Sequence, residues 1–194
     1  MKISLSPRED TFHGITLEKD VVLEWRPIGR IDSSGTFRQL SGAHGLYAFV
    51  LVSNQENEPN RQVVLYVGKA GGIKPGQATR WANDIQKRVT EHWDNGPFRG
   101  LAKTLQQCYH INLWAIDLKS SLGKIWERDI ELIENTYIRT FKNKKIGDLP
   151  GNSAVEGSSS RRFKIEVVEP FKLPLPSIRM LSGITEDTRR PKTR

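Results

Sequence analysis

The chain has 194 residues, of which 37% are hydrophobic and 27% are charged, and its formal net charge is +8 at pH 7. This length and composition fit one globular domain, and the single cysteine excludes a disulfide framework and a cysteine-rich zinc site. No apolar run approaches the roughly 20 residues that span a bilayer, so we expect a soluble protein of the reducing cytoplasm without a membrane partner. The excess of basic over acidic residues favours a polyanionic partner such as nucleic acid.

The first part of the chain is predicted to be a polar extension with one short strand. Residues 1–19 show no clear hydrophobic period, whereas 21–26 (VVLEWR) is strand-like. Residues 27–36 are rich in turn formers and predict a loop.

Two strand-like runs follow, and each holds a tyrosine beside a glycine. Residues 45–52 (GLYAFVLV) and 62–68 (QVVLYVG) are separated by a polar connection, which predicts a β-hairpin. In neighbouring antiparallel strands, Tyr47 and Tyr66 could project from the same face, about one strand spacing apart.

The next predicted helix carries charged residues on its apolar side. Over residues 80–93 the large apolar side chains recur every four residues, and a short helical stretch is expected at 100–107. At about 100° per residue, His92 falls inside the apolar arc and Arg88 falls at its edge.

The second half of the chain is predicted to hold a strand at 111–118 and a long amphipathic helix at 122–141. Ser121 is the expected N-cap of that helix, and Glu134 falls inside its apolar arc. A loop and a final strand at 162–168 follow.

These elements predict an α+β fold, with a small central antiparallel sheet of about three strands flanked by helices. The predicted core spans 45–152. We expect an N-terminal extension over 1–44 and a C-terminal extension over 153–194, with partial disorder from residue 170.

Five polar residues are predicted to meet between the sheet and the two helices. A charged group on a core-facing stripe is costly unless it is paired or binds a ligand. Each residue alone could be structural, for example an ion pair of Arg88 with Glu134. Together they are a better candidate for chemistry than for packing: Tyr47, Tyr66, Arg88, His92 and Glu134.

The order of these residues resembles that of the GIY-YIG nucleases. The segments GLY at 45–47 and YVG at 66–68 match the two strands that name the family. The stretch DIQKRVTEHW supplies the family's arginine as Arg88 and its histidine as His92, and LIENTYI supplies the glutamate as Glu134.

One position departs from the family pattern. The family usually ends its core with an asparagine, and here Ile146 stands at the expected place. Asn152 in PGN would correspond to that asparagine if a short insertion precedes it, or it is a plain loop residue.

The resemblance implies a divalent-metal-dependent endonuclease that hydrolyses phosphodiester bonds of double-stranded DNA. It implies one divalent cation on Glu134, usually Mg²⁺ and otherwise an ion such as Mn²⁺, with waters completing the oxygen shell. Asn152 is then the remaining catalytic candidate.

The resemblance also implies roles for the other site residues. Tyr47 would orient or deprotonate the attacking water, and we expect Lys69 and Arg88 to lower the pKa of its phenol. Arg88 would hold a non-bridging phosphate oxygen. His92 and Tyr66 would assist proton transfer or fix the phosphate.

The chain looks most like a stand-alone restriction endonuclease of this family, because it has extensions but no expected second domain. Its basic runs offer DNA contacts at Lys144, Lys145, Arg161 and Arg162. A duplex target read symmetrically would suggest a homodimer. The alternatives are a repair-type or homing-type nuclease, or a non-catalytic nucleic-acid-binding protein that keeps the fold.

Overall fold

The structure is a computed structural model with a mixed α+β fold and two antiparallel sheets, in agreement with the predicted fold class. Among the described residues, no helix is long and apolar enough to cross a membrane. The structure describes residues 20–31, 37–55, 62–74, 76–77, 80–143, 149, 151–152, 165–168, 175 and 177–180.

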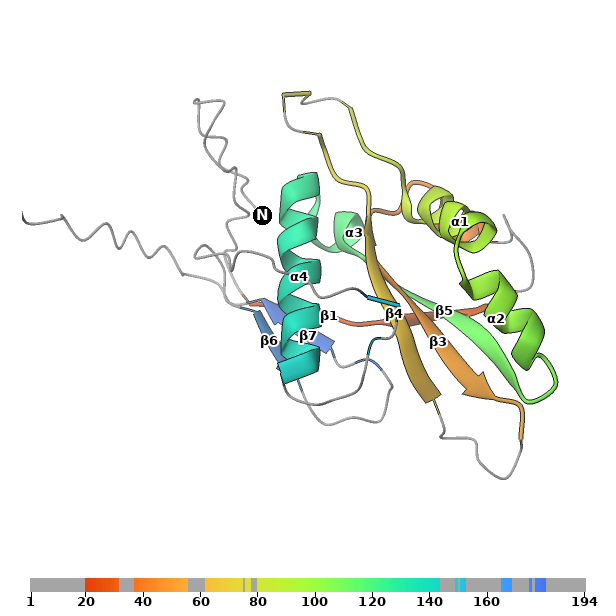
Figure 1. Cartoon of the computed structure of the whole chain (residues 1–194). Coiled ribbons are helices and arrows are strands. Elements are labelled where there is room, and N and C mark those ends of the chain that lie inside the picture. The colour runs from red at the N-terminus through yellow and green to blue at the C-terminus, as the bar shows by residue number, and fades with distance from the viewer. Residues whose placement is uncertain are drawn as a thin grey trace, which may run out of the picture.

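The central sheet has four strands in the order β2-β5-β3-β4. The three predicted strands are present as β3 (Gly45–Ser53), β4 (Gln62–Ala70) and β5 (Tyr109–Asp117). β2 (Arg26–Arg30) adds a fourth strand at one edge, beside β5 (Figure 1).

The prediction of a loop from residue 27 onward was wrong for residues 27–30, which belong to β2. The register with β5 shifts between Pro27 and Gly29, and Gly29 has a φ of 136°. A proline and a glycine are tolerated in a strand that lies at a sheet edge and contains an irregularity.

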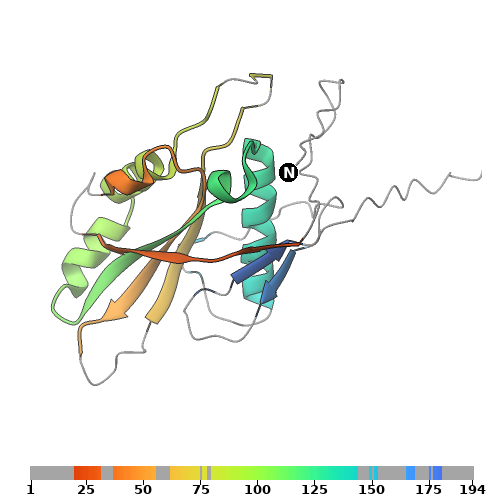
Figure 2. The same cartoon turned by 180° about the vertical axis from the view of Figure 1, so that it is seen from behind.

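A second, three-stranded sheet has the order β1-β7-β6. It consists of β1 (Val21–Leu23), β7 (Ser177–Met180) and β6 (Ile165–Val168), and the last of these lies within the predicted final strand. Figure 2 shows one extended segment that runs from β1 into β2 and so links the two sheets. The prediction of partial disorder from residue 170 was wrong for β7, because Ile178 and Met180 are fully buried.

The predicted helix at 80–93 begins later, as α1 (Ile85–Asn95). The Asp84 carboxylate accepts a hydrogen bond from the Lys87 backbone N–H at 2.9 Å and caps the helix. The short predicted helix is present as α2 (Phe98–Leu105).

The predicted long helix at 122–141 is two helices, α3 (Leu118–Leu122) and α4 (Glu127–Asn143). Gly123 ends α3 at a φ of 77°, a conformation that favours glycine. Ser121 therefore lies inside α3 and is not an N-cap; the Asp117 carboxylate caps α3 through the Ser120 backbone N–H.

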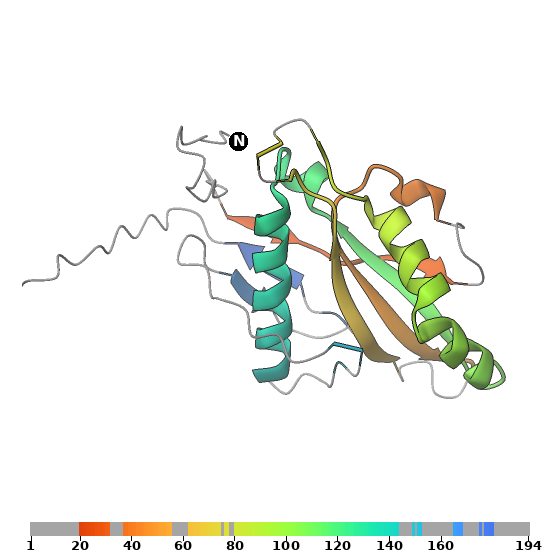
Figure 3. The ribbon, with the colours of Figure 1, turned by 45° about the horizontal axis from the view of Figure 1, so that its top comes forward.

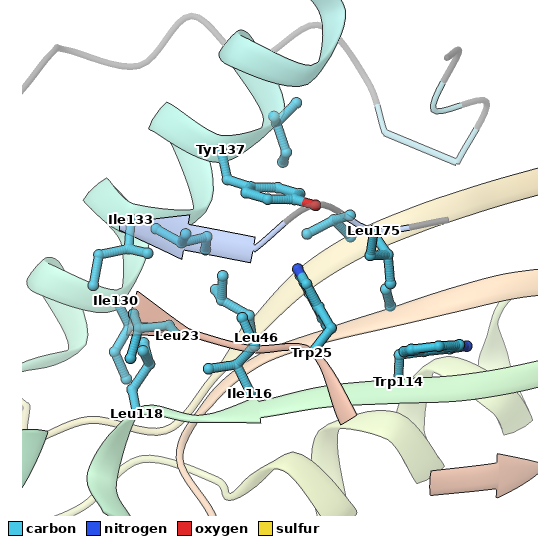
Figure 4. Packing of buried hydrophobic residues seen from close by; sticks show 14 of the residues in the cluster. Leu23, Trp25, Leu46, Trp114, Ile116, Leu118, Ile130, Ile133, Tyr137 and Leu175 are labelled. Atoms are coloured by element: carbon cyan, nitrogen blue, oxygen red, sulfur yellow. The ribbon is translucent and has the colours of Figure 1, made fainter. Parts of the chain in front are cut away.

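The central sheet is covered on both faces, and each face has its own buried cluster. Along β3, Leu46 and Ala48 pack with residues of α4, while Tyr47 and Phe49 pack with residues of α1. Figures 1 and 3 show α4 on one side of the sheet and α1 and α2 on the other. The cluster under α4 contains large aromatic and aliphatic side chains, labelled in Figure 4 as Leu23, Trp25, Leu46, Trp114, Ile116, Leu118, Ile130, Ile133, Tyr137 and Leu175.

Candidate active site

The two tyrosines project from the same face of the central sheet, as the strand alternation predicted. Tyr47 lies opposite Gly68, and Tyr66 lies opposite Phe49 in the β3–β4 pair. The two phenol rings are 5.8 Å apart between centroids. A Cβ at Gly68 would lie 2.8 Å from the Tyr47 hydroxyl and 2.5 Å from Tyr66 Cε1. Glycine is therefore required between the two rings.

The other motif glycine fixes where β3 begins. A Cβ at Gly45 would lie 2.1 Å from the Ile116 carbonyl oxygen and 2.8 Å from the Leu118 nitrogen. Only glycine permits this approach of β3 to the junction of β5 and α3. Because Tyr47 is two residues further along the strand, this contact also helps to place its ring.

Tyr47 and His92 form a buried hydrogen-bonded pair. The Tyr47 hydroxyl lies 3.0 Å from His92 Nδ1, and the tyrosine is fully buried. Burial, reinforced by the neighbouring Tyr66, raises the pKa of Tyr47 well above its ordinary value. Burial and the Arg88 charge lower the pKa of His92. At neutral pH the pair therefore consists of a neutral phenol and a neutral imidazole, and the tautomer of the imidazole sets which of them donates.

The expectation that Lys69 and Arg88 lower the pKa of Tyr47 was wrong. The attraction of Arg88 is weaker than the penalty of burying the phenolate. Lys69 follows Gly68 on β4, so its side chain points to the opposite face, where its Nζ lies 3.0 Å from Glu131 Oε2 of α4.

A hollow of about 360 Å³ lies between β4, α1 and α4 and brings together four of the predicted site residues, Tyr66, Lys69, Arg88 and Glu134. Tyr47 and His92 do not line it, but their rings lie 5.8 and 5.2 Å from that of Tyr66, which does. The full lining is Tyr66, Lys69, Ala70, Gly71, Lys74, Ala82, Asn83, Arg88, Glu127 and Glu134.

The Glu134 carboxyl in this hollow has a strongly shifted pKa. Burial raises its pKa to about 7, and the Lys69 charge offsets only part of that rise. A carboxylate in this state is deprotonated readily when a further cation arrives. The described residues hold no cluster of three or more metal-binding His, Cys, Asp or Glu side chains.

Two of the three basic residues that line the hollow, Lys69 and Arg88, form ion pairs with glutamates on its rim. Arg88 Nη1 lies 3.3 Å from Glu91 Oε2, and Lys69 is held by Glu131 as described above. Among the described residues these pairs occur instead of an ion pair of Arg88 with Glu134. Exposed pairs of this kind contribute at most about 1 kcal/mol, so an anionic ligand can displace either glutamate.

Asn152 lies at the open edge of β4, where it extends the sheet. Its Nδ2 donates to the Val67 carbonyl oxygen at 2.7 Å, and the Val67 N–H donates to its Oδ1 at 2.9 Å. The neighbouring Gly151 N–H donates to the Leu65 carbonyl oxygen at 2.8 Å. The side-chain amide is therefore bonded to the edge of the strand that carries Tyr66, and Asn152 does not line the hollow.

Sequence reasoning missed the two rim glutamates. The usable signals were helical spacing and strand alternation: Glu91 follows Arg88 by three positions on α1, and Glu131 lies on the helix that faces Lys69. The predicted DNA contacts Lys144, Lys145, Arg161 and Arg162 lie outside the described residues.

Comparisons of the chain with protein-family models, with curated proteins and with solved structures give no match.

Proposed function

We propose that the chain is a divalent-metal-dependent endonuclease of the GIY-YIG type that hydrolyses phosphodiester bonds of duplex DNA. The observation that carries this proposal is the convergence of Tyr66, Arg88 and Glu134 on one hollow. They come from β4, α1 and α4 and offer a phenol, a guanidinium and a carboxylate at one open place. The net charge of +8 supports a polyanionic substrate.

Mg²⁺ is the proposed cofactor, and Glu134 is the residue proposed to hold it. The site fits a hard cation because the Glu134 carboxyl is half-buried and has a pKa near 7. A bound cation would therefore stabilise its deprotonated form. Mg²⁺ keeps several waters and needs only one or two carboxylates. When bound, the ion supplies positive charge to the phosphate and acidifies a water.

Arg88 is proposed to bind the scissile phosphate. Its guanidinium lies on the wall of the hollow, and within the described part of the chain its ion-pair partner is the half-exposed Glu91. A phosphate oxygen can replace the Glu91 carboxylate, because arginine binds both groups through the same planar donors.

The tyrosines and His92 are proposed to move a proton away from the hollow. Tyr66 lines the hollow, and its ring centroid lies 5.8 Å from that of Tyr47, whose hydroxyl is hydrogen-bonded to His92 Nδ1. As the Tyr66 hydroxyl accepts a proton, its own proton can pass to the Tyr47 oxygen while the Tyr47 proton moves to Nδ1, so that both phenols stay neutral. The imidazole is then the final acceptor, because the raised pKa of Tyr47 makes a stable phenolate unfavourable.

Cleavage of supercoiled plasmid tests the proposal. We expect cutting in Mg²⁺ and none in EDTA. Glu134→Gln should lose on the order of 10²-fold or more, because a metal supplies several kcal/mol of transition-state stabilisation. Glu24→Gln, an exposed carboxylate outside the hollow, is the matched control. Cutting in EDTA, or full activity of Glu134→Gln, would contradict the proposal.

The alternative function is non-catalytic binding of nucleic acid. The ion pairs of Lys69 and Arg88 with rim glutamates favour it. Plasmid binding in both Mg²⁺ and EDTA, without cutting in either, would support this alternative.

The finer assignments rest on the family resemblance. We propose a restriction-type role, duplex DNA as substrate and a homodimer that reads a symmetric site. Mapping the cut ends on DNA of known sequence tests the first two. Sedimentation with and without a cognate duplex tests the third.

A further inference from the structure

Three segments of the chain form a small, rigid joint at the rim of the hollow. Ile73 pairs antiparallel with Trp81 and parallel with Trp126. The Ile73 N–H donates to the Ile125 carbonyl at 2.9 Å, and the Glu127 N–H donates to the Ile73 carbonyl at 3.0 Å. The two tryptophans therefore flank Ile73, with their Cα atoms on the order of 10 Å apart. Figure 3 shows the connection from β4 to α1 beside α3 and the start of α4.

Each tryptophan of this joint lies under a lysine ammonium group. Lys119 Nζ is 4.7 Å from the Trp81 ring centroid, and Lys124 Nζ is 5.7 Å from that of Trp126. Such contacts restrict the lysine side chains while leaving their charge in place. The Trp81 ring is also stacked on His44, with centroids 4.5 Å apart. We name Lys74, Trp81, Lys119, Lys124 and Trp126 the basic platform.

The charges of the basic platform are not neutralised by ion pairs. Over the described residues, Lys74, Lys119 and Lys124 form none, in contrast to Lys69 and Arg88 in the hollow. Two nearby acids, Asp84 and Asp117, accept hydrogen bonds from backbone N–H groups at the starts of α1 and α3, and Glu127 lines the hollow with Lys74. Three cations without these ion pairs, two of them restricted over tryptophan rings, are suited to bind an extended anion.

We propose that the basic platform binds the sugar-phosphate backbone of duplex DNA beyond the scissile phosphate. This inference rests on the proposed function, which places the scissile phosphate in the hollow. Lys74 belongs both to the wall of the hollow and to the platform, so the two surfaces are continuous. A duplex carries a phosphate about every 3.4 Å along each strand, so DNA that fills the hollow must continue past its rim. Lysines contact such phosphates without reading sequence.

The salt dependence of binding to a duplex of about 30 base pairs measures these contacts. We would follow fluorescence anisotropy of the full chain in EDTA over a range of salt concentrations. Each lost phosphate contact reduces the slope of log K against log[salt] by about 0.9. The double variant Lys119→Gln/Lys124→Gln should therefore show a slope that is shallower by about 2. Arg99→Gln/Lys103→Gln on α2 is the matched control and should keep the wild-type slope.

The outcomes separate this inference from the proposed function. Wild-type binding and cutting with an unchanged slope in the platform variant would overturn only the platform. A wild-type chain that neither binds nor cuts DNA would overturn both. The chain could instead bind anionic phospholipid vesicles through the same lysines and not bind duplex DNA. That result would identify a membrane surface as the partner and would also overturn the platform inference. If the double variant fails to fold, Lys124→Gln alone should change the slope by about 0.9.

Discussion

The hydroxyl of Tyr47 lies 3.0 Å from Nδ1 of His92, and this contact joins the first motif strand to the first motif helix inside the core. The histidine is two turns of α1 beyond Ile85, which is itself buried against the same face of the sheet. Packing of α1 therefore sets the separation of the two polar atoms.

Removal of the Tyr47 hydroxyl should impair both stability and cleavage. Tyr47→Phe leaves the partly buried His92 Nδ1 without its hydrogen-bond partner, which costs about 1–2 kcal/mol in the free energy of unfolding. If the pair moves a proton, cleavage should fall by on the order of 10²–10⁴-fold. Tyr137→Phe, a buried tyrosine of the other cluster, is the control and should change stability without loss of cleavage. Equal cleavage by both variants would exclude a proton-transfer role for Tyr47.

A methyl group at Gly68 should force the two tyrosines apart. Gly68→Ala places its Cβ 2.8 Å or less from atoms of both rings, so we expect destabilisation of about 1–3 kcal/mol and loss of cleavage. The control is Gly100→Ala in α2, where an added Cβ meets nothing within 4 Å. That change should stabilise the chain by roughly 0.5–1 kcal/mol. Urea unfolding and plasmid cleavage measure both variants, and a neutral Gly68→Ala would contradict the tight contact.

Stability should fall as pH rises from about 4.5 to about 7 because of Glu134. The pKa of this carboxyl is raised from 4.5 to about 7 in the folded chain, so between these values the folded state binds more protons than the unfolded state. The loss of unfolding free energy is at most about 3 kcal/mol and is complete above the folded pKa. Glu134→Gln cannot ionise, so it should lack this slope and be more stable than wild type at pH 8 without metal.

Mg²⁺ should restore the stability that is lost at high pH in the wild type and not in Glu134→Gln. A cation that binds the folded state and not the unfolded state stabilises the chain by RT ln(1 + [L]/Kd), and this raises the melting temperature. At pH 8 we expect Mg²⁺ to raise the melting temperature of the wild type and not that of Glu134→Gln. The same pH slope in both proteins, or an equal response to Mg²⁺, would contradict the assignment of Glu134.

Loss of Arg88 should affect cleavage far more than stability. Arg88→Ala removes a half-exposed ion pair worth at most about 1 kcal/mol, but it takes away the proposed phosphate ligand and should slow cleavage by on the order of 10²-fold. Arg99 offers a matched control, since it is an exposed arginine that lies 3.8 Å from Asp94. Arg99→Ala should leave the cleavage rate unchanged. An unaltered rate in Arg88→Ala would remove Arg88 from the site.

Much of the site was predictable because the relevant patterns are local. The period of a strand places Tyr47 and Tyr66 on one face, and the period of a helix places Arg88 and His92 together. The same alternation already assigns Lys69 to the opposite face from Tyr66, which the expected role for Lys69 overlooked. Gly68 could be recognised as a motif residue, but the reason for it is visible only once both rings are in place.

The sequence by itself determined the α+β class, the three central strands and the two helices that carry the polar residues, because periodicity and turn residues act over a few positions. The tertiary structure alone decided which segments from distant parts of the chain pair, such as β1 with β7 or Asn152 with Val67. It also decided the ionisation of Tyr47 and Glu134. Burial depends on everything packed around a group, and here its effect exceeds that of the neighbouring charges.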